Sequence, residues 1–199
     1  MGFDLYGVKP KIKEGSVKPE RPDWDNCTEA ERDEYFSAKD KFESENKGYY
    51  FRNNVWHWRP LAQYVIEHTK VITDKKKIDG FSYNDGVEIS AEEAEQIAKQ
   101  LYYLLQSGHT KQYEKKYMAD YKKAKIHNIK IYKEMDTFQK AMDKKYKTDI
   151  APKDYPKAEY EKWNAIYSKL DNNGSYPFHI ENVKEFAEFA EQSGGFTIC

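Results

Sequence analysis

The chain has 199 residues, a length that suits one domain or one domain with an appendage. Its 33 basic and 34 acidic residues nearly cancel, so no overall charge favours nucleic acid or an anionic membrane. No apolar run approaches the ~20 residues needed to span a bilayer, and the N-terminus lacks the pattern of a signal peptide. We therefore expect a soluble, cytoplasmic protein with no membrane contact and no strong nucleic-acid signal.

Cysteine and histidine usage gives no sign of a metal site. Cys27 and Cys199 form neither a disulfide framework nor a C-x-x-C knuckle, which agrees with a reducing compartment. The five histidines are scattered without H-E-x-x-H spacing. The sequence therefore predicts no metal and no cofactor.

The N-terminal part predicts a strand, a loop and a helix. Apolar residues alternate over residues 2–8, as in a short strand. Prolines, glycines and charges dominate from Lys9 to Asp25, where we expect a surface loop. Thr28 and Glu31 have the spacing of a capping box, which predicts a helix to about Glu45.

Residues 49–61 form the segment that is richest in aromatic and hydrogen-bonding side chains. It holds no serine, cysteine or carboxylate, so it suits a binding surface better than a reaction centre. Guanidinium and amide groups donate hydrogen bonds to phosphate or carboxylate, and indoles offer stacking faces. The candidate ligand-binding residues here are Arg52, Asn53, Asn54, Trp56, Trp58 and Arg59.

The same segment also has a purely structural interpretation. Its first half predicts an extended stretch, and a helix is expected to begin near Trp56 or at Pro60. In that case Trp56 and Trp58 belong to the core, while Asn53 or Asn54 caps the helix. The sequence leaves both interpretations open.

A turn and a helix follow in the middle of the chain. Tyr83, Asn84 and Asp85 precede Gly86 in a predicted turn and complete the set of candidate ligand-binding residues. Asp85 could also serve as a general base or a metal ligand, although an Asp before Gly in a turn usually bonds its own backbone. Ser90 and Glu93 form a second capping box, and the broad apolar stripe after them predicts a core helix ending at Gly108.

Residues 110–171 predict a helical hairpin. Between Thr110 and Thr148 there is no proline or glycine, and apolar residues recur three or four apart, which indicates one long helix. A second helix is expected over about 157–170, after two prolines. The surface, rich in Tyr and Lys, could contact a partner, but interspersed acidic residues favour an ordinary solvated face.

The fold class is therefore predicted to be mainly α (α+β). A last helix should end at Gly194 and Gly195, and residues 196–199 should form a strand pairing with Phe3–Tyr6. This gives a helical domain with a small β element, formed by the termini and the segment near 49–54. Residues 1–109 and 172–199 would form this core domain, with 110–171 as a long αα-hairpin insertion.

Four segments resemble an uncharacterised family of bacteriophage and bacterial proteins. They are Gly2-Phe3-Asp4-Leu5-Tyr6-Gly7; the stretch from Tyr50-Phe51-Arg52-Asn53-Asn54-Val55-Trp56 to Pro60-Leu61; Asn84-Asp85-Gly86; and Glu181-Asn182-Val183 through Phe186 to Gly194-Gly195-Phe196. The resemblance implies a phage-type origin, hence location in the host cytoplasm, and a shared domain. It implies no activity.

These observations lead to one functional hypothesis and one alternative. The hypothesis is a non-enzymatic, phage-type accessory protein that binds a small anionic or nucleotide-like ligand, such as a signal of host defence. The alternative is a protein-interaction, self-associating or virion-associated module whose working surface is the helical hairpin. An enzyme is disfavoured because no acid–base pair or nucleophile constellation can be named.

Overall fold

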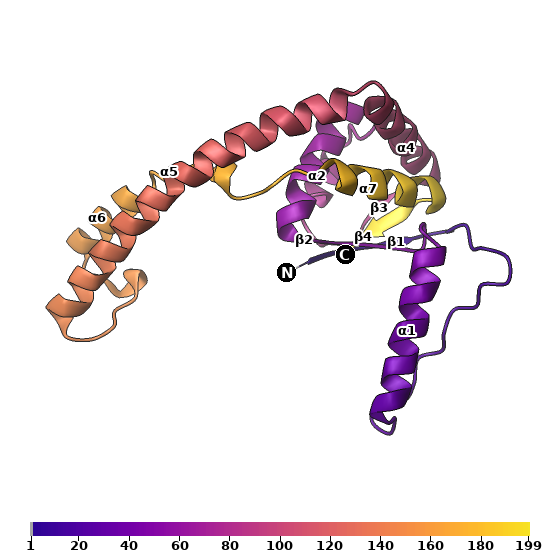
Figure 1. The fold of residues 1–199 in the computed structure, drawn as a ribbon, viewed down its shortest axis with the longest axis horizontal. Coiled ribbons are helices and arrows are strands. Elements are labelled where there is room, and N and C mark those ends of the chain that lie inside the picture. Colours follow the sequence, from indigo (N-terminus) through magenta and orange to yellow (C-terminus); the bar gives the residue numbers. More distant parts are fainter. Residues whose placement is uncertain (1) are drawn as a thin grey trace. The chain divides into compact units, whose positions relative to one another are not determined.

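The computed structural model describes residues 2–199, and the chain divides into two compact units (Figure 1). The first, here called the core unit, contains residues 1–112 and 179–199. The second, the hairpin unit, is the intervening Tyr113–Phe178. That the second unit is an insertion separable from the first stays a prediction.

The core unit contains a four-stranded antiparallel sheet. Its strands are β1 (Gly2–Gly7), β2 (Tyr50–Asn54), β3 (Val87–Ile89) and β4 (Phe196–Ile198), in the order β2-β1-β4-β3. The sheet and the helices around it confirm the predicted mainly α fold with a small β element formed by the termini and the segment near 49–54. β3 was not predicted, because three residues are too few to show an alternating pattern.

Three helices lie on one side of this sheet (Figure 1). They are α2 (Val55–Thr69), α4 (Ala91–Gln106) and α7 (Ile180–Gln192). Two of them, α2 and α7, contact its strands, and α4 packs against the other two. Phe3 and Leu5 of β1 point toward them and are buried, as is Trp58 of α2. The core is rich in rings: Phe3 stacks on Trp58 at 5.3 Å, and Phe186 lies edge-on to Trp58 at 5.9 Å. The helices thus bury the aromatic face of the sheet.

Two further helices complete the core unit. In α1 (Glu29–Glu45) the predicted capping box between Thr28 and Glu31 is present, and Phe42 is the helix's buried residue. The short α3 (Lys75–Gly80) was not expected, since three consecutive lysines are typical of a solvated loop. Asp74 explains it, because its carboxylate accepts the Lys77 amide at 3.0 Å and so caps the helix.

The hairpin unit consists of two antiparallel helices. α5 (His109–Tyr146) begins in the core unit and continues into the hairpin unit, where α6 (Lys157–Tyr167) returns along it. Lys145 pairs with Glu159 and Glu134 with Lys169, which fixes the antiparallel order. Short 3₁₀ turns, η1 (Pro152–Asp154) and η2 (Asn172–Gly174), flank α6. None of the helices in residues 2–199 is long and apolar enough to cross a membrane.

Three backbone segments meet closely at the end of β1. A Cβ on Gly7 would overlap the Gly48 carbonyl, and a Cβ on Gly48 would overlap the Gln192 carbonyl at the end of α7. The Lys9 amide donates to the Ser193 carbonyl at 3.1 Å beside them. We call this meeting point the glycine junction. It requires glycine for space, since Gly7 and Gly48 have no positive φ.

The glycine junction predicts a large stability loss for Gly48→Ala. The added methyl group meets backbone and not a movable side chain, so the free energy of unfolding should fall by at least about 3 kcal/mol. Gly15→Ala is the control: Gly15 has a φ of +77° but nothing within 4 Å, so only conformational strain of about 1–2 kcal/mol applies. Urea denaturation measures both, and equal losses would contradict the steric explanation.

Candidate functional site

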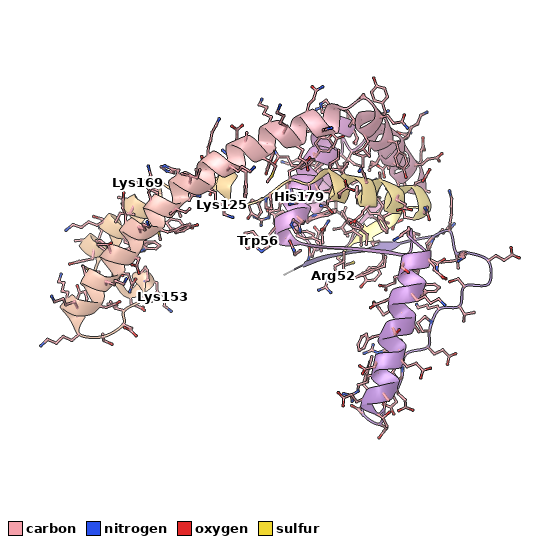
Figure 2. All side chains as sticks on the ribbon, viewed as in Figure 1. Arg52, Trp56, Lys125, Lys153, Lys169 and His179 are labelled. Atoms are coloured by element: carbon pink, nitrogen blue, oxygen red, sulfur yellow. The ribbon has the colours of Figure 1, made fainter. Side chains whose placement is uncertain are left out.

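The alternation of β2 separates two of the predicted ligand-binding residues. Arg52 points to the sheet face opposite the helices, where its side chain is 68% exposed and its Nε lies 3.5 Å from Asp4 Oδ1 (Figure 2). On the same face the Tyr50 hydroxyl donates to Asp4. Burial, followed by this hydrogen bond to a carboxylate, raises the pKa of Tyr50 well above its ordinary value.

Asn53 and Trp58 point into the core. The Asn53 amide donates to Asn182 Oδ1 at 2.7 Å, and the Asn182 amide donates to the His57 carbonyl at 3.1 Å. The Trp58 indole donates to the Phe81 carbonyl at 2.7 Å. The buried Trp58 agrees with the structural interpretation of this segment, and Asn53 bonds Asn182 and does not cap a helix.

Four further predicted residues lie at the surface, and two of them, Asn54 and Asn84, have structural roles. Asn54 caps α2 by accepting the His57 amide at 3.1 Å, as the structural interpretation allowed. Trp56 in the first turn is 52% exposed, so its placement in the core by the same interpretation is wrong. Asn84 donates to the Gly2 carbonyl at 2.6 Å, which ties the turn to β1. Asp85 is exposed in that turn. The nine predicted residues therefore do not form one site.

Arg59 and Tyr83, however, line the same cleft. This cavity of about 470 Å³ lies between α2 and the segment from α3 to Tyr83. Its other polar residues, which the sequence did not single out, are Gln63, Glu67, Asp79 and Ser82. Its apolar wall consists of Ala62, Ile66, Ile78 and Phe81. The Tyr83 ring is 64% exposed at the cleft. We call this cavity the α2–α3 cleft.

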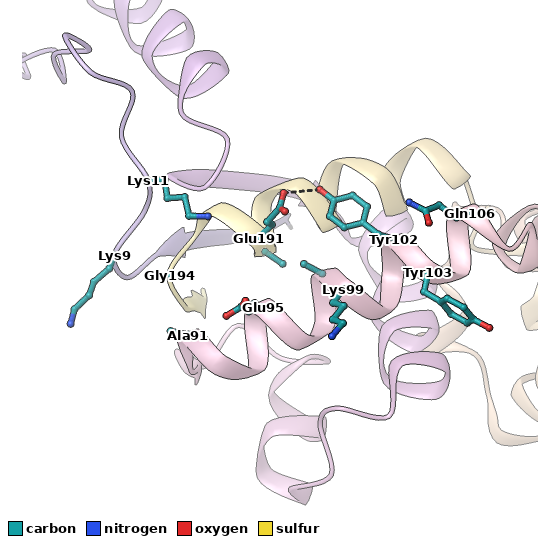
Figure 3. A pocket seen from close by; sticks show the side chains of 12 residues that line it. Lys9, Lys11, Ala91, Glu95, Lys99, Tyr102, Tyr103, Gln106, Glu191 and Gly194 are labelled. Carbon is teal, nitrogen blue, oxygen red and sulfur yellow. Dashed lines mark hydrogen bonds between the residues drawn. The ribbon is translucent and has the colours of Figure 1, made fainter.

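A larger groove of about 650 Å³ runs between α4, α7 and the residues after β1 (Figure 3). Its floor contains small residues, among them Ala98 and Ala190, and its rim carries lysines and glutamates. The Tyr102 hydroxyl donates to Glu191 at 3.0 Å, and burial, with this bond second, raises the pKa of Tyr102 to about 12. Lys9 points away from the groove (Figure 3). The rim carries both positive and negative side chains, and the Tyr102 hydroxyl is already bonded to Glu191. The groove therefore does not favour one class of ligand.

Sequence reasoning missed this groove for a physical reason. Ala98 and Ala190 look like ordinary core positions of two amphipathic helices, and only their juxtaposition creates the space. The contribution of the N-terminal loop is equally invisible in sequence, because Lys11 reaches the end of α7 by a backbone bond of 2.8 Å to Gln192.

A cluster of titratable side chains lies where α2 meets the start of α5. The buried Tyr64 hydroxyl lies 3.0 Å from His109 Nδ1 and 2.9 Å from Thr110 Oγ1. The His68 and His109 rings are 4.8 Å apart. Burial, with the neighbouring charge of His109 second, lowers the pKa of His68. Within residues 2–199, no three His, Cys, Asp or Glu side chains are grouped so that they could hold a metal ion.

Comparison of the chain with protein-family models, with curated proteins and with solved structures finds no match. The resemblance to a phage and bacterial family therefore stays an expectation based on its motifs. Function has to be argued from the geometry of the chain itself.

The histidine cluster predicts a loss of stability on acidification. A native pKa of His68 below the ordinary value of about 6.5 means that the unfolded chain binds more protons below that pH. The unfolding free energy should therefore fall as the pH drops below about 6.5, and His68→Gln should flatten this dependence. An NMR titration of His68 measures the pKa directly, and His109→Gln should raise it. A midpoint at or above 6.5 in the wild type would contradict the interpretation.

Proposed function

We propose that the chain is a binding protein for a small nucleotide-like anion and that the α2–α3 cleft is the binding site. The observation that supports this most is the presence of Arg59 and Tyr83 in one cavity. Both were selected as ligand-binding types from sequence alone. The volume of about 470 Å³ lies within the range of small-molecule sites.

The chemistry of the cleft matches the parts of a nucleotide. The Arg59 guanidinium supplies charge-assisted donors for a phosphate, and the exposed Tyr83 ring supplies a stacking face for a base. Glu67 and Asp79 offer acceptors for the amino hydrogens of a base. Their negative charge opposes further phosphates, so the cleft favours a nucleoside monophosphate or a cyclic nucleotide over a triphosphate.

A second candidate function is a protein-interaction module that uses the hairpin unit, either for a partner or for self-association. It is favoured by a surface groove of about 520 Å³ with Phe138, Ala141 and Ile166 in its wall. Exposed Ile126 and Ile129 on α5 add apolar surface. A phage-type origin and a host-defence signal as the ligand stay hypotheses that rest on the sequence motifs alone.

Isothermal titration with mono-, di- and cyclic nucleotides tests the proposed site. Loss of a charge-assisted hydrogen bond costs about 1.5–3 kcal/mol, so Arg59→Ala should weaken binding about 10- to 100-fold. Tyr83→Ala should also weaken binding, whereas Tyr83→Phe should retain it, because stacking does not require the hydroxyl.

Arg52→Ala is the matched control. It removes the same charge from the open face of the sheet and should leave affinity within about twofold, since that arginine does not line the cleft. If no nucleotide binds, the proposed function is wrong. If Arg52→Ala loses affinity and folded Arg59→Ala does not, the ligand sits on the open sheet face and the cleft assignment is wrong.

A further inference from the structure

The nearly neutral chain consists of two oppositely charged units. The hairpin unit contains 15 basic residues, all lysine, and 10 acidic residues, for a net charge of +5. The core unit contains 18 basic and 24 acidic residues, for a net charge of −6. The overall value of −1 therefore hides a strong segregation of charge, and the case against a polyanionic partner does not extend to the hairpin unit.

The positive charge is concentrated on one face of α5. At 3.6 residues per turn, seven lysines fall within an arc of roughly 100°, and they extend for about 43 Å along the helix. They are Lys115, Lys122, Lys123, Lys130, Lys133, Lys140 and Lys144, all of them exposed. We call this arc the lysine face. α5 is described in full, and between Lys115 and Lys144 none of its carboxylates lies within the arc.

Most of this charge is not neutralised inside the protein. Lys123 lies 3.5 Å from Asp120, and Lys140 lies 2.7 Å from Asp136, with both lysine side chains more than 70% exposed. Such exposed pairs contribute little and exchange readily for another anion. The other five lysines form no ion pair with any residue in the described part of the chain. The lysine face is thus available to an external anion.

We propose that the lysine face binds the phosphate backbone of double-stranded nucleic acid without reading its sequence. A row of point charges along a continuous helix matches a linear polyanion, whose affinity comes from release of condensed counterions. The hairpin unit contains no arginine, the residue that most often reads guanine by a bidentate contact. Backbone contacts without base recognition are therefore the expected mode.

Features of α5 argue against a membrane surface as the partner. A helix that binds at a bilayer interface inserts a continuous apolar face opposite its basic one. In α5 that opposite face, represented by Ala124 and Ile131, is already buried within the hairpin unit. The lysine face itself holds Ile126 as its one large apolar residue, too little to anchor a helix.

The test is fluorescence anisotropy with two unrelated 25-base-pair DNA duplexes between 50 and 200 mM KCl. Wild-type protein should bind both within about threefold of each other, and affinity should fall steeply with salt. The combined variant Lys122→Gln, Lys130→Gln and Lys133→Gln should bind at least tenfold more weakly at 50 mM KCl. The slope of log affinity against log salt should become shallower by about 2 to 3, one for each lost phosphate contact. Glutamine preserves helix propensity.

The matched control removes three lysines of the same unit outside this face: Lys153 (labelled in Figure 2), Lys157 and Lys162, all changed to Gln. It has the same net charge as the first variant and should lose less than threefold. Equal losses in both variants would show attraction by net charge only and would overturn the proposal. So would no binding of duplex DNA, or binding of phosphatidylserine vesicles in its place. Lysine-dependent self-association at low salt without DNA binding would instead assign the face to a second copy of this chain.

Discussion

The core unit depends on how the two ends of the chain are brought together at the glycine junction. Gly7, Gly48 and Gln192 approach so closely that no Cβ fits between them, and this approach places β1 beside β4. Asp4 and Cys199 exchange two backbone hydrogen bonds of 2.8 Å as a result. The sheet then supplies the surface on which α2 and α7 bury aromatic side chains, while α4 contributes buried aliphatic residues. Both termini thus take part in closing the core unit, which leads to the prediction that this unit folds without residues 113–178.

Local signals made much of the fold predictable. The capping boxes at Thr28 and Ser90 mark helix starts that the structure confirms, because they depend on side chains three residues apart. β3 escaped prediction because it is set by pairing with β4, far along the chain, whereas α3 was missed because its three lysines are typical of a loop, although Asp74 offers a local cap. The sequence therefore predicts elements whose ends are set by neighbouring residues, and it misses a short strand that forms only by pairing with a distant segment.

The candidate site was predictable only in its residue types. Composition cannot show that Arg52 and Asn53 point to opposite faces of a strand. Nor can it show that the indole N–H of Trp58 donates to a backbone carbonyl in the core and so is not available to a ligand. It also cannot show that Arg59 and Tyr83 line the same cleft, because they are 24 positions apart in the sequence. The net charge of the whole chain is also a poor guide, because its value near zero is the sum of an acidic core unit and a basic hairpin unit. This division supports only the polyanion proposed for the hairpin unit, whereas the small anion proposed for the core unit rests on the residues of the α2–α3 cleft.

Replacing residues 113–178 by a short glycine–serine turn between Gln112 and His179 tests the central claim, that the core unit closes on itself through its termini. Near-UV circular dichroism and urea denaturation of this shortened chain are the measurement. The account predicts a retained tertiary signal from the packed Trp58 cluster and a single cooperative unfolding transition. Loss of the near-UV signal with retained helical far-UV signal would show that the hairpin unit is integral to the core, and would contradict the account.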